Sequence, residues 1–215
     1  MRRGDDKRVK ILDAALALFR KKGFAETSMR DVAKAAGVAL GAAYYYFPSK
    51  DAIVLAYYDR TQNEHAAEVR AVFAETDDVR LRLGACFHGK IELLARDRKL
   101  LSGLFRSIAD PTAPVSIFGD AAKRVRDGSI ALFDEALGGL PLDAASRRVL
   151  VLALWSLHMG LMLFFVHDTS KKQEKTRRLV DRSLDFVVRI LPIAPELAPV
   201  FGADVAGMLA EAGLL

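Results

Sequence analysis

The sequence predicts an all-α protein with an N-terminal three-helix head and a C-terminal helical body. Apolar residues recur at helical spacing in nearly every long segment of the 215-residue chain. Glycine and proline separate these segments, and none of them shows the strict alternation of a half-buried strand. With 52% hydrophobic residues, the chain is long and apolar enough to bury a sizeable core. We place the domain boundary at residue 50, which gives a head of residues 1–50 and a body of residues 51–215.

The first two helices of the head are predicted from apolar spacing and end signals. The apolar stripe of the first helix consists of Val9, Leu12, Leu16 and Phe19. Three cations and then Gly23 follow this stripe, as is usual at the C-terminal end of a helix. Thr27 or Ser28 can cap the second helix, and Asp31 lies three residues after Ser28, in the manner of a capping box. Gly37 should end this short helix.

The third helix should begin near Ala39 and end before Pro48, because proline cannot continue a helix. A helix turns 100° per residue, which predicts two faces for this segment. The core-facing pair should be Ala43 and Phe47, with Leu40 close by. The opposite face should carry Gly41, Ala42 and Tyr45. The edges should carry Tyr44 and Tyr46. Two short helices joined by a tight turn that contains a glycine are the arrangement of a helix-turn-helix.

The body is predicted to contain six further helices. Ser49 can cap the first of them, which starts near Asp51 and continues into the 70s. The other five should span about residues 79–97, 98–108, 120–138, 144–167 and 173–191. The apolar tail, residues 195–215, has the composition for a last short helix.

All of the excess positive charge lies in the first 60 residues. They hold 12 Lys and Arg against 7 Asp and Glu, whereas residues 61–215 hold 20 of each. A basic head on a neutral body favours a polyanionic partner for the head, such as nucleic acid. Cys86 is the single cysteine, which excludes an intrachain disulfide and a cysteine-rich zinc site. The N-terminus lacks the apolar core of a signal peptide, so we expect a cytoplasmic protein.

Residues 149–166 form an uncharged run of 18 residues, close to the length of a membrane span. The run contains Ser156 and His158, and the next segment is amphipathic. Its apolar stripe consists of Val180, Leu184, Val187 and Leu191. We therefore expect helix 144–167 to be buried between neighbouring helices and a second subunit, with no membrane involved. A membrane-associated helical protein is the alternative.

Several features of residues 8–58 follow one another in a specific order and spacing. They are the ILDAAL segment, Gly23-Phe24, Thr27, Arg30-Asp31-Val32-Ala33, Ala36-Gly37-Val38, Gly41, Tyr44, Tyr46-Phe47 and Lys50. In this order they resemble the tetracycline-repressor (TetR) family of bacterial regulators. The rest of the chain resembles the family only in being helical. The resemblance implies a homodimer that binds a palindromic double-stranded DNA operator and is released by a small molecule.

The resemblance also implies which head residues would contact DNA. The phosphate contacts would come from Thr27, Ser28, Tyr44, Tyr46 and Lys50. Arg30, Ala42 and Tyr45 would lie near base edges, where Gly41 lets the helix come close. The family commonly has polar residues in place of Ala39 and Leu40, and Ser or Thr in place of Ala42. We therefore expect this head to depend more on positioning and DNA shape than a typical relative does.

The resemblance implies an effector pocket among the middle helices of the body and a four-helix dimer contact through the helices at about 144–167 and 173–191. The candidate effector-binding residues are Phe87, Leu101, Leu104, Phe105, Ile108, Phe118, Phe133, Trp155, His158, Met159 and Met162. Few charges occur near them, so we expect a small apolar or aromatic effector, with His88 or His158 as polar contacts. Ordinary core packing is the alternative for each of these residues.

The sequence gives no indication of catalysis, a metal site or a cofactor. The four histidines show no zinc-ligand spacing, and GxSxG and phosphate-loop motifs are absent. The sequence therefore predicts a ligand-responsive DNA-binding transcriptional regulator, most simply a repressor, that is not an enzyme. A DNA-binding protein whose body only dimerises, without an effector, is a further alternative.

Overall fold

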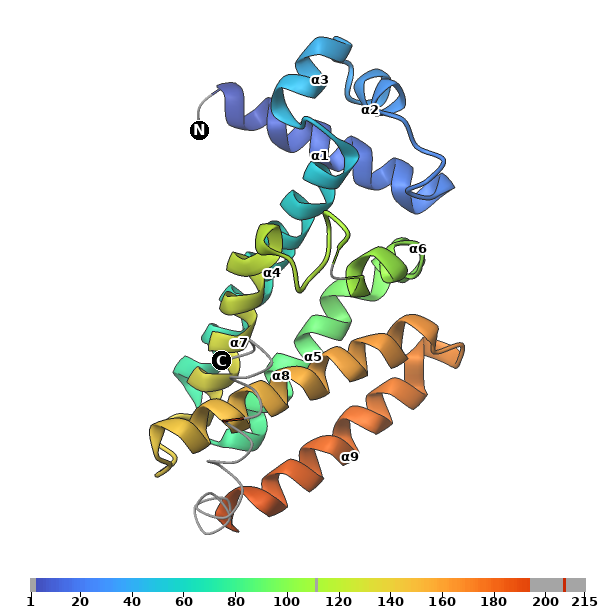
Figure 1. Ribbon diagram of the computed structural model, residues 1–215. Helices are drawn as coiled ribbons and strands as arrows, with labels where there is room; N and C mark the ends of the chain where they lie inside the picture. The colour runs from blue at the N-terminus through green and yellow to red at the C-terminus, as the bar shows by residue number, and fades with distance from the viewer. Residues whose placement is uncertain (1–2, 111, 194–206, 208–215) are drawn as a thin grey trace. The chain divides into compact units, whose positions relative to one another are not determined.

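The computed structural model describes residues 3–110, 112–193 and 207. Within these residues, nine α-helices and four short 3-10 helices follow one another without a strand (Figure 1). The predicted all-α fold class is confirmed. The tail helix predicted for residues 195–215 falls on a segment of which only Gly207 is described.

The bounds of the helices agree closely with the predicted segments. The α-helices are α1 (Arg3–Lys22), α2 (Met29–Ala36), α3 (Leu40–Tyr46), α4 (Lys50–Glu75), α5 (Val79–Leu94), α6 (Arg98–Ala109), α7 (Lys123–Leu137), α8 (Ala144–His167) and α9 (Glu174–Ile190). The 3-10 helices are η1 (Ala95–Asp97), η2 (Asp120–Ala122), η3 (Lys171–Gln173) and η4 (Leu191–Ile193). Two predicted helices therefore run partly as 3-10 turns, since 79–97 ends in η1 and 120–138 begins with η2.

The chain forms two compact units. The first unit consists of residues 1–63 and 94–126, and the second consists of residues 64–93 and 127–215. α4 contributes its first part to the first unit and its last part to the second. The first unit therefore joins α1, α2 and α3 with η1, α6 and η2. A functional boundary at residue 50 stays a prediction.

α1 and α2 bury one face each in the core of the first unit. α1 buries Ile11, Leu12, Ala15, Leu16 and Phe19, and α2 buries Met29, Val32, Ala33 and Ala36. The prediction that Val9 belongs to this apolar stripe is wrong, because its side chain is 47% exposed. At 100° per residue, the five buried residues of α1 centre on a direction about 90° away from Val9. Val9 therefore lies at the edge of the stripe.

A buried carboxylate connects α1, α4 and η1 within the first unit. Asp97 is 2% exposed. Arg20 of α1 donates its Nε–H to one carboxylate oxygen, and the hydroxyl of Tyr57 on α4 donates to the other at 2.8 Å. Burial raises the pKa of Tyr57, and the charge of Asp97 raises it further. This network ties the last turn of α1 to the segment that precedes α6.

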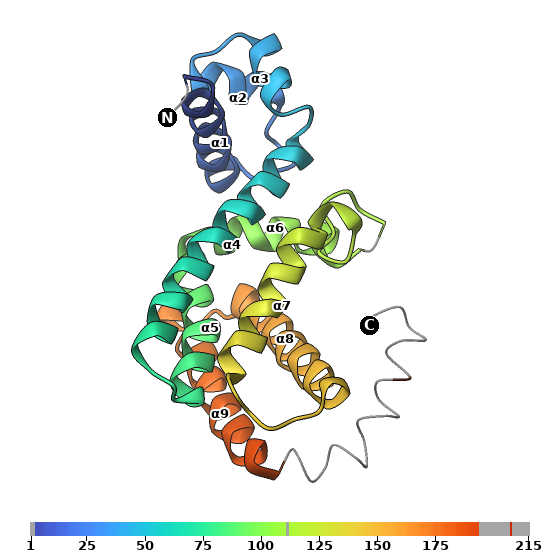
Figure 2. The same ribbon diagram turned by 90° about the vertical axis from the view of Figure 1, so that its left-hand side faces the viewer.

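α9 folds back along α8 in the second unit (Figures 1 and 2). Asp168 holds the connection between the two helices. Its carboxylate accepts from the Ser170 N–H at 2.8 Å, from the Thr176 N–H at 2.9 Å and from the Thr176 hydroxyl at 2.6 Å. Burial opposes the charged form, but the hydrogen bonds outweigh it and hold the pKa of Asp168 below its usual range. The α8–α9 hairpin is thus closed by a charged hydrogen-bond acceptor.

Among the described helices, α8 alone is long and apolar enough to cross a membrane by length and composition. Its most apolar window has a mean hydropathy of 2.3, and 39% of that window is buried within the chain. Core helices of soluble proteins meet the same criteria, so this composition is weak evidence for a span. The large apolar residues that α8 and α9 expose are Leu163, Phe164, Leu179 and Phe186. The outer surface of this hairpin is therefore partly apolar.

Candidate nucleic-acid interface and candidate ligand core

A tight turn joins α2 and α3 as a helix-turn-helix. Gly37 follows α2 with φ 63° and ψ 40°, and its N–H donates to the carbonyl oxygen of Ala33. The Val38 N–H donates to the same oxygen at 3.0 Å. This left-handed conformation favours glycine, because a side chain there would be strained. α3 then starts at Leu40, so only residues 37–39 separate the two helices.

α3 presents opposite faces to the core and to the exterior. Ala43 is 0% exposed and Phe47 is 1% exposed, as the helical spacing predicts. Tyr45 is 82% exposed, Tyr44 is 49% exposed and Tyr46 is partly exposed. The rings of Tyr45 and Tyr46 meet edge to face, with their centroids 5.1 Å apart. We refer to Tyr44, Tyr45 and Tyr46 as the tyrosine surface.

α3 begins one residue after Ala39, close to the predicted start of this helix. Ala39 is exposed, and its φ of −64° and ψ of 148° place it before the helix as the N-cap residue. A helical projection therefore does not apply to it. Leu40, the first residue of α3, is partly buried.

Phe47 fixes the end of α3 on the core. Its N–H donates to the Ala43 carbonyl oxygen at 2.9 Å, while its own backbone is extended. The guanidinium of Arg8 on α1 lies 4.9 Å from the centroid of the Phe47 ring, which is a cation–π distance. The anchor of α3 is thus covered by α1.

Ser28 and Arg30 lie at the N-terminus of α2, and both are exposed. The predicted capping box is confirmed: Ser28 Oγ accepts from the Asp31 N–H at 3.2 Å, and Asp31 accepts from the Ser28 N–H at 2.9 Å. A hydrogen bond from Lys22, together with those from Ser28, holds the pKa of Asp31 well below its usual range. The cap therefore fixes the start of α2 and leaves Arg30 in solvent.

Thr27 and Lys50, two predicted phosphate contacts, have internal partners. Thr27 is 1% exposed, and its hydroxyl donates to the Gly23 carbonyl oxygen at 2.7 Å. Lys50 Nζ donates to the carbonyl oxygens of Phe24 at 2.8 Å and Ala25 at 3.3 Å, and lies 4.5 Å from the centroid of the Phe24 ring. Both side chains close the loop between α1 and α2. Their contact with DNA stays a prediction.

The predicted effector-binding residues fall into both units. The first unit holds Leu101, Leu104, Phe105, Ile108 and Phe118, and the second holds Phe87, Phe133, Trp155, His158, Met159 and Met162. Phe118 is 47% exposed, whereas Leu101, Leu104 and Trp155 are buried. Phe105, Ile108, Met159 and Met162 are partly buried. The role of each residue in effector binding stays a prediction.

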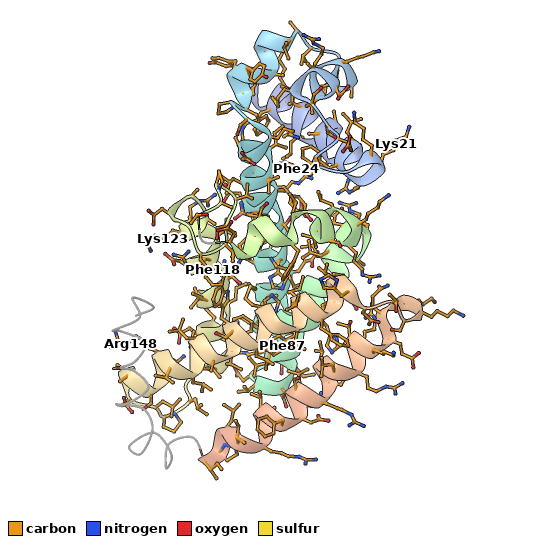
Figure 3. The ribbon with its side chains drawn as sticks, turned by 45° about the vertical axis from the view of Figure 1, so that its right-hand side comes forward. Lys21, Phe24, Phe87, Phe118, Lys123 and Arg148 are labelled. Atoms are coloured by element: carbon orange, nitrogen blue, oxygen red, sulfur yellow. The ribbon has the colours of Figure 1, made fainter. Side chains whose placement is uncertain are left out.

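Three of these residues form an aromatic cluster in the second unit. The cluster consists of Phe87 on α5, Phe133 on α7 and His158 on α8. The ring centroids of Phe87 and Phe133 are 5.3 Å apart. The centroid of the His158 ring lies 5.8 Å from that of Phe87 and 5.6 Å from that of Phe133. Figure 3 labels Phe87 at the level where α5 and α8 cross. His158 is 2% exposed, so its imidazole is enclosed by apolar rings.

His65 on α4 adds a second buried imidazole that the sequence analysis does not single out. It is 2% exposed, and its Nε2 lies 3.0 Å from the Cys86 carbonyl oxygen. Burial lowers the pKa of His65 to about 3, and the charge of Lys90 acts in the same direction. Burial, Lys90 and His65 all lower the pKa of His158 as well. His65 could have been predicted as buried from its spacing of four residues to the apolar Val69, because this spacing places both side chains on one helix face.

His88 and Cys86 do not provide reactive groups in this core. His88 Nε2 lies 2.9 Å from a carboxylate oxygen of Asp181 near the surface, and its role as a polar contact for an effector stays a prediction. Cys86 is fully buried, and burial raises the pKa of its thiol to about 12. It is therefore a thiol rather than a reactive thiolate at neutral pH. Across the described residues, no group of three His, Cys, Asp or Glu could hold a metal ion.

Comparison with known proteins decides the family. Residues 11–57 match the family described as bacterial regulatory proteins of the tetR family, and residues 82–201 match the tetracyclin repressor-like C-terminal domain. The second match covers more than half of the chain. The chain belongs to the TetR family. This TetR-family membership makes it a helix-turn-helix transcriptional regulator and not an enzyme, as the sequence predicts.

The relatives match this TetR-family chain to different extents. The HTH-type regulator EthR of Mycolicibacterium smegmatis is 46% identical over 56 residues, which cover 26% of this chain and 26% of EthR. The chain thus spans about a quarter of the length of this relative. An uncharacterised HTH-type regulator of Mycobacterium tuberculosis is 30% identical over 168 residues, 76% of this chain and 78% of that protein.

The solved structures include a TetR-family repressor, FadR of Thermus thermophilus, in complex with lauroyl-CoA. It is 28% identical, with a TM-score of 0.59, and the similarity covers 80% of this chain and 92% of FadR. A putative TetR-family regulator of Syntrophomonas wolfei has a TM-score of 0.68 at 19% identity, covering 87% of this chain and 95% of that one. The second comparison supports the fold alone.

Proposed function

We propose that this TetR-family chain is a homodimeric, cytoplasmic repressor that leaves a palindromic DNA operator when a small apolar or aromatic effector binds its body. The observation that carries the proposal is the tyrosine surface of α3. It lies opposite the buried Ala43 and Phe47, so α3 can enter a groove while its core contacts stay intact. A major groove about 12 Å wide admits a helix of this kind.

The exposed residues of the head have separate roles in this proposal. The hydroxyls of Tyr44 and Tyr46 donate to phosphate oxygens, which positions the head without reading the sequence. Tyr45, the most exposed of the three, faces base edges together with Ala42 and the nearby Gly41. Arg30 at the start of α2 contacts DNA from the preceding helix. Two heads in successive major grooves would lie about 34–36 Å apart.

We expect Tyr44→Phe to weaken DNA binding about fivefold on all sequences, because one hydroxyl hydrogen bond is lost. Tyr45→Ala should weaken binding at least about tenfold and change the base preference at one position. Fluorescence anisotropy on an operator selected from random DNA, at several salt concentrations, measures both. Leu81→Ala on α5 is the control, since Leu81 is 54% exposed and outside the head.

Two results would contradict this assignment of the head. The first is DNA binding without salt dependence, because contacts with phosphates release counterions. The second is an unchanged affinity and base preference in Tyr45→Ala.

The dimer is proposed from the apolar surface of α8 and α9. Phe186 is 63% exposed, and it borders a groove of about 380 Å³ whose other lining residues include Leu150, Ala153, Leu157 and Ile190. Pairing of this hairpin with its twofold mate would cover the groove. An exposed apolar patch of this kind marks an interface more often than a monomer surface.

Phe186→Arg should convert the dimer to a monomer, with the dimer dissociation constant raised about a hundredfold, because a charge would enter the apolar centre of the interface. Sedimentation velocity at several concentrations measures the change. Phe118→Arg, at an exposed phenylalanine of the first unit, should leave the dimer intact. Equal sedimentation of wild type and Phe186→Arg would exclude this surface as the dimer contact.

An effector can release the operator only if it binds the DNA-free state more tightly than the DNA-bound state. A thermal-shift screen that finds no stabilising compound would favour the alternative in which the body only dimerises. Recovery of the protein in the membrane fraction of the cell would favour the membrane-associated alternative.

A further inference from the structure

Two buried imidazole nitrogens in the second unit have no hydrogen-bond partner among the described residues. They are Nδ1 of His65 and Nε2 of His158. Both histidines are 2% exposed. Buried polar atoms are nearly always hydrogen-bonded, because an unpaired one keeps the cost of its lost hydration. Each of these nitrogens therefore calls for a partner that the described side chains do not supply.

The hydrogen bond at Nε2 of His65 determines whether Nδ1 of the same ring donates or accepts. Nε2 of His65 lies 3.0 Å from the Cys86 carbonyl oxygen, which can only accept a hydrogen bond. Nε2 therefore carries the proton, and Nδ1, on the other edge of the ring, is an acceptor. The missing partner of His65 must donate a hydrogen bond.

The charge in this core selects among donors. Burial lowers the pKa of Lys90 to about 8, so this lysine is still mostly protonated near pH 7. Its charge acts on both imidazoles and lowers the pKa of each, after burial itself. A cationic donor such as an ammonium group would be repelled here. A neutral hydroxyl group can donate the hydrogen bond and carries no positive charge for Lys90 to repel.

The side chains around His158 indicate which kind of group the ligand carries next to its polar group. Its ring lies against Phe87 and Phe133, with centroids within 5.8 Å. Trp155, one turn earlier on α8, is 7% exposed. A partner that reaches His158 therefore needs an apolar or aromatic body behind its polar group.

We propose that His65 and His158 hold the acidic hydroxyl group of the effector, an apolar molecule that carries one carboxylic acid or phenol. The ligand O–H donates to Nδ1 of His65, and a ligand oxygen accepts from Nε2 of His158 in its N–H tautomer. The apolar part of the ligand packs against Phe87 and Phe133. This inference rests on the proposed effector function of the body and adds the chemical class of the ligand.

Nitrogen NMR of the full-length chain labelled at its histidines tests the contact directly. The chain has four histidines, so the signals of His65, His88, His158 and His167 can be assigned by single substitutions. The probes are decanoic acid and 4-hexylphenol, with methyl decanoate and hexylbenzene as matched compounds that lack the O–H. We expect the acids, and not their matched compounds, to shift His65 Nδ1 and His158 Nε2. His88, which faces Asp181 near the surface, should not respond.

Affinity measurements on variants add a second readout. Trp155 is the single tryptophan and lies one turn from His158, so its fluorescence reports binding in this core. His65→Phe should weaken the acid probe at least about tenfold and leave methyl decanoate unchanged. His88→Phe is the matched control. Thermal unfolding of each variant verifies that it is folded, and the NMR result on the wild type does not depend on the variants.

The outcomes separate this inference from the proposed function. A response to either acid supports the inference and tells which acid is bound. Equal binding of acids and matched compounds, or unshifted imidazole signals because water alone occupies the site, would overturn it. In that case operator binding by the ligand-free protein would show that the proposed function still stands. If the ligand-free wild type binds no operator while the acids still shift the imidazole signals, the ligand class stands and the proposed function falls.

Discussion

Replacement of Asp97 by alanine is expected to lower the free energy of unfolding by about 3 kcal/mol. Asp97 is 2% exposed and accepts hydrogen bonds from Arg20 and Tyr57. Without it, a partly buried guanidinium and a buried hydroxyl lose their partner. This loss of stability is at the lower end for a broken buried ion pair, because the Arg20 side chain is 30% exposed and so is partly hydrated. Urea denaturation followed by circular dichroism measures the loss.

Tyr57→Phe is the graded control for this network. It removes one hydrogen bond and leaves the Arg20–Asp97 ion pair in place, so the loss should be about 1 kcal/mol. If Asp97→Ala were no more destabilising than Tyr57→Phe, the ion pair would contribute nothing, and Asp97 would matter only as the acceptor for the tyrosine.

Phe47→Ala should destabilise the first unit by about 3–5 kcal/mol, because it opens a cavity at the end of α3. The ring is 1% exposed, and Arg8 loses its cation–π partner in the same change. We also expect DNA binding to fall below detection, since α3 would no longer be held against the core. Calorimetry and anisotropy with the selected operator measure the two effects.

The neighbouring Tyr45 provides a sharp contrast for Phe47. Tyr45 is 82% exposed, so Tyr45→Ala should change the free energy of unfolding by less than about 0.5 kcal/mol while it weakens DNA binding. The two substitutions, two residues apart on one short segment, thus separate folding from recognition. A large loss of stability in Tyr45→Ala would show that this ring packs in the core instead.

The helices and the faces of α3 could be predicted because their signals are local. The Ser28–Asp31 cap and Gly37 lie within a few residues of the helix ends that they fix. The inward position of Phe47 and the outward position of Tyr45 follow from 100° per residue. The rule does not extend to Ala39, because this residue precedes the helix and does not follow its rotation.

The partners of several side chains could not be predicted because they lie far away in the sequence. Lys50 donates to Phe24, which is 26 residues earlier, and Arg20 is 77 residues from Asp97. A single sequence holds no local pattern for such pairs. His65 belongs to the same class, since its Nε2 pairs with the carbonyl oxygen of Cys86, 21 residues later.

The network around Asp97 also bears on the order in which the chain becomes able to fold. The first unit needs residues 1–63 and 94–126, so its two parts leave the ribosome with a 30-residue interval between them. During that interval Arg20 and Tyr57 have emerged but their buried acceptor has not. Synthesis proceeds at about 5–20 residues per second, so residues 1–63 wait a few seconds before the rest of the first unit emerges. A fragment that ends before Asp97 should therefore be less stable than the same helices in the whole chain, and a fragment meant to fold as the first unit should extend through residue 126.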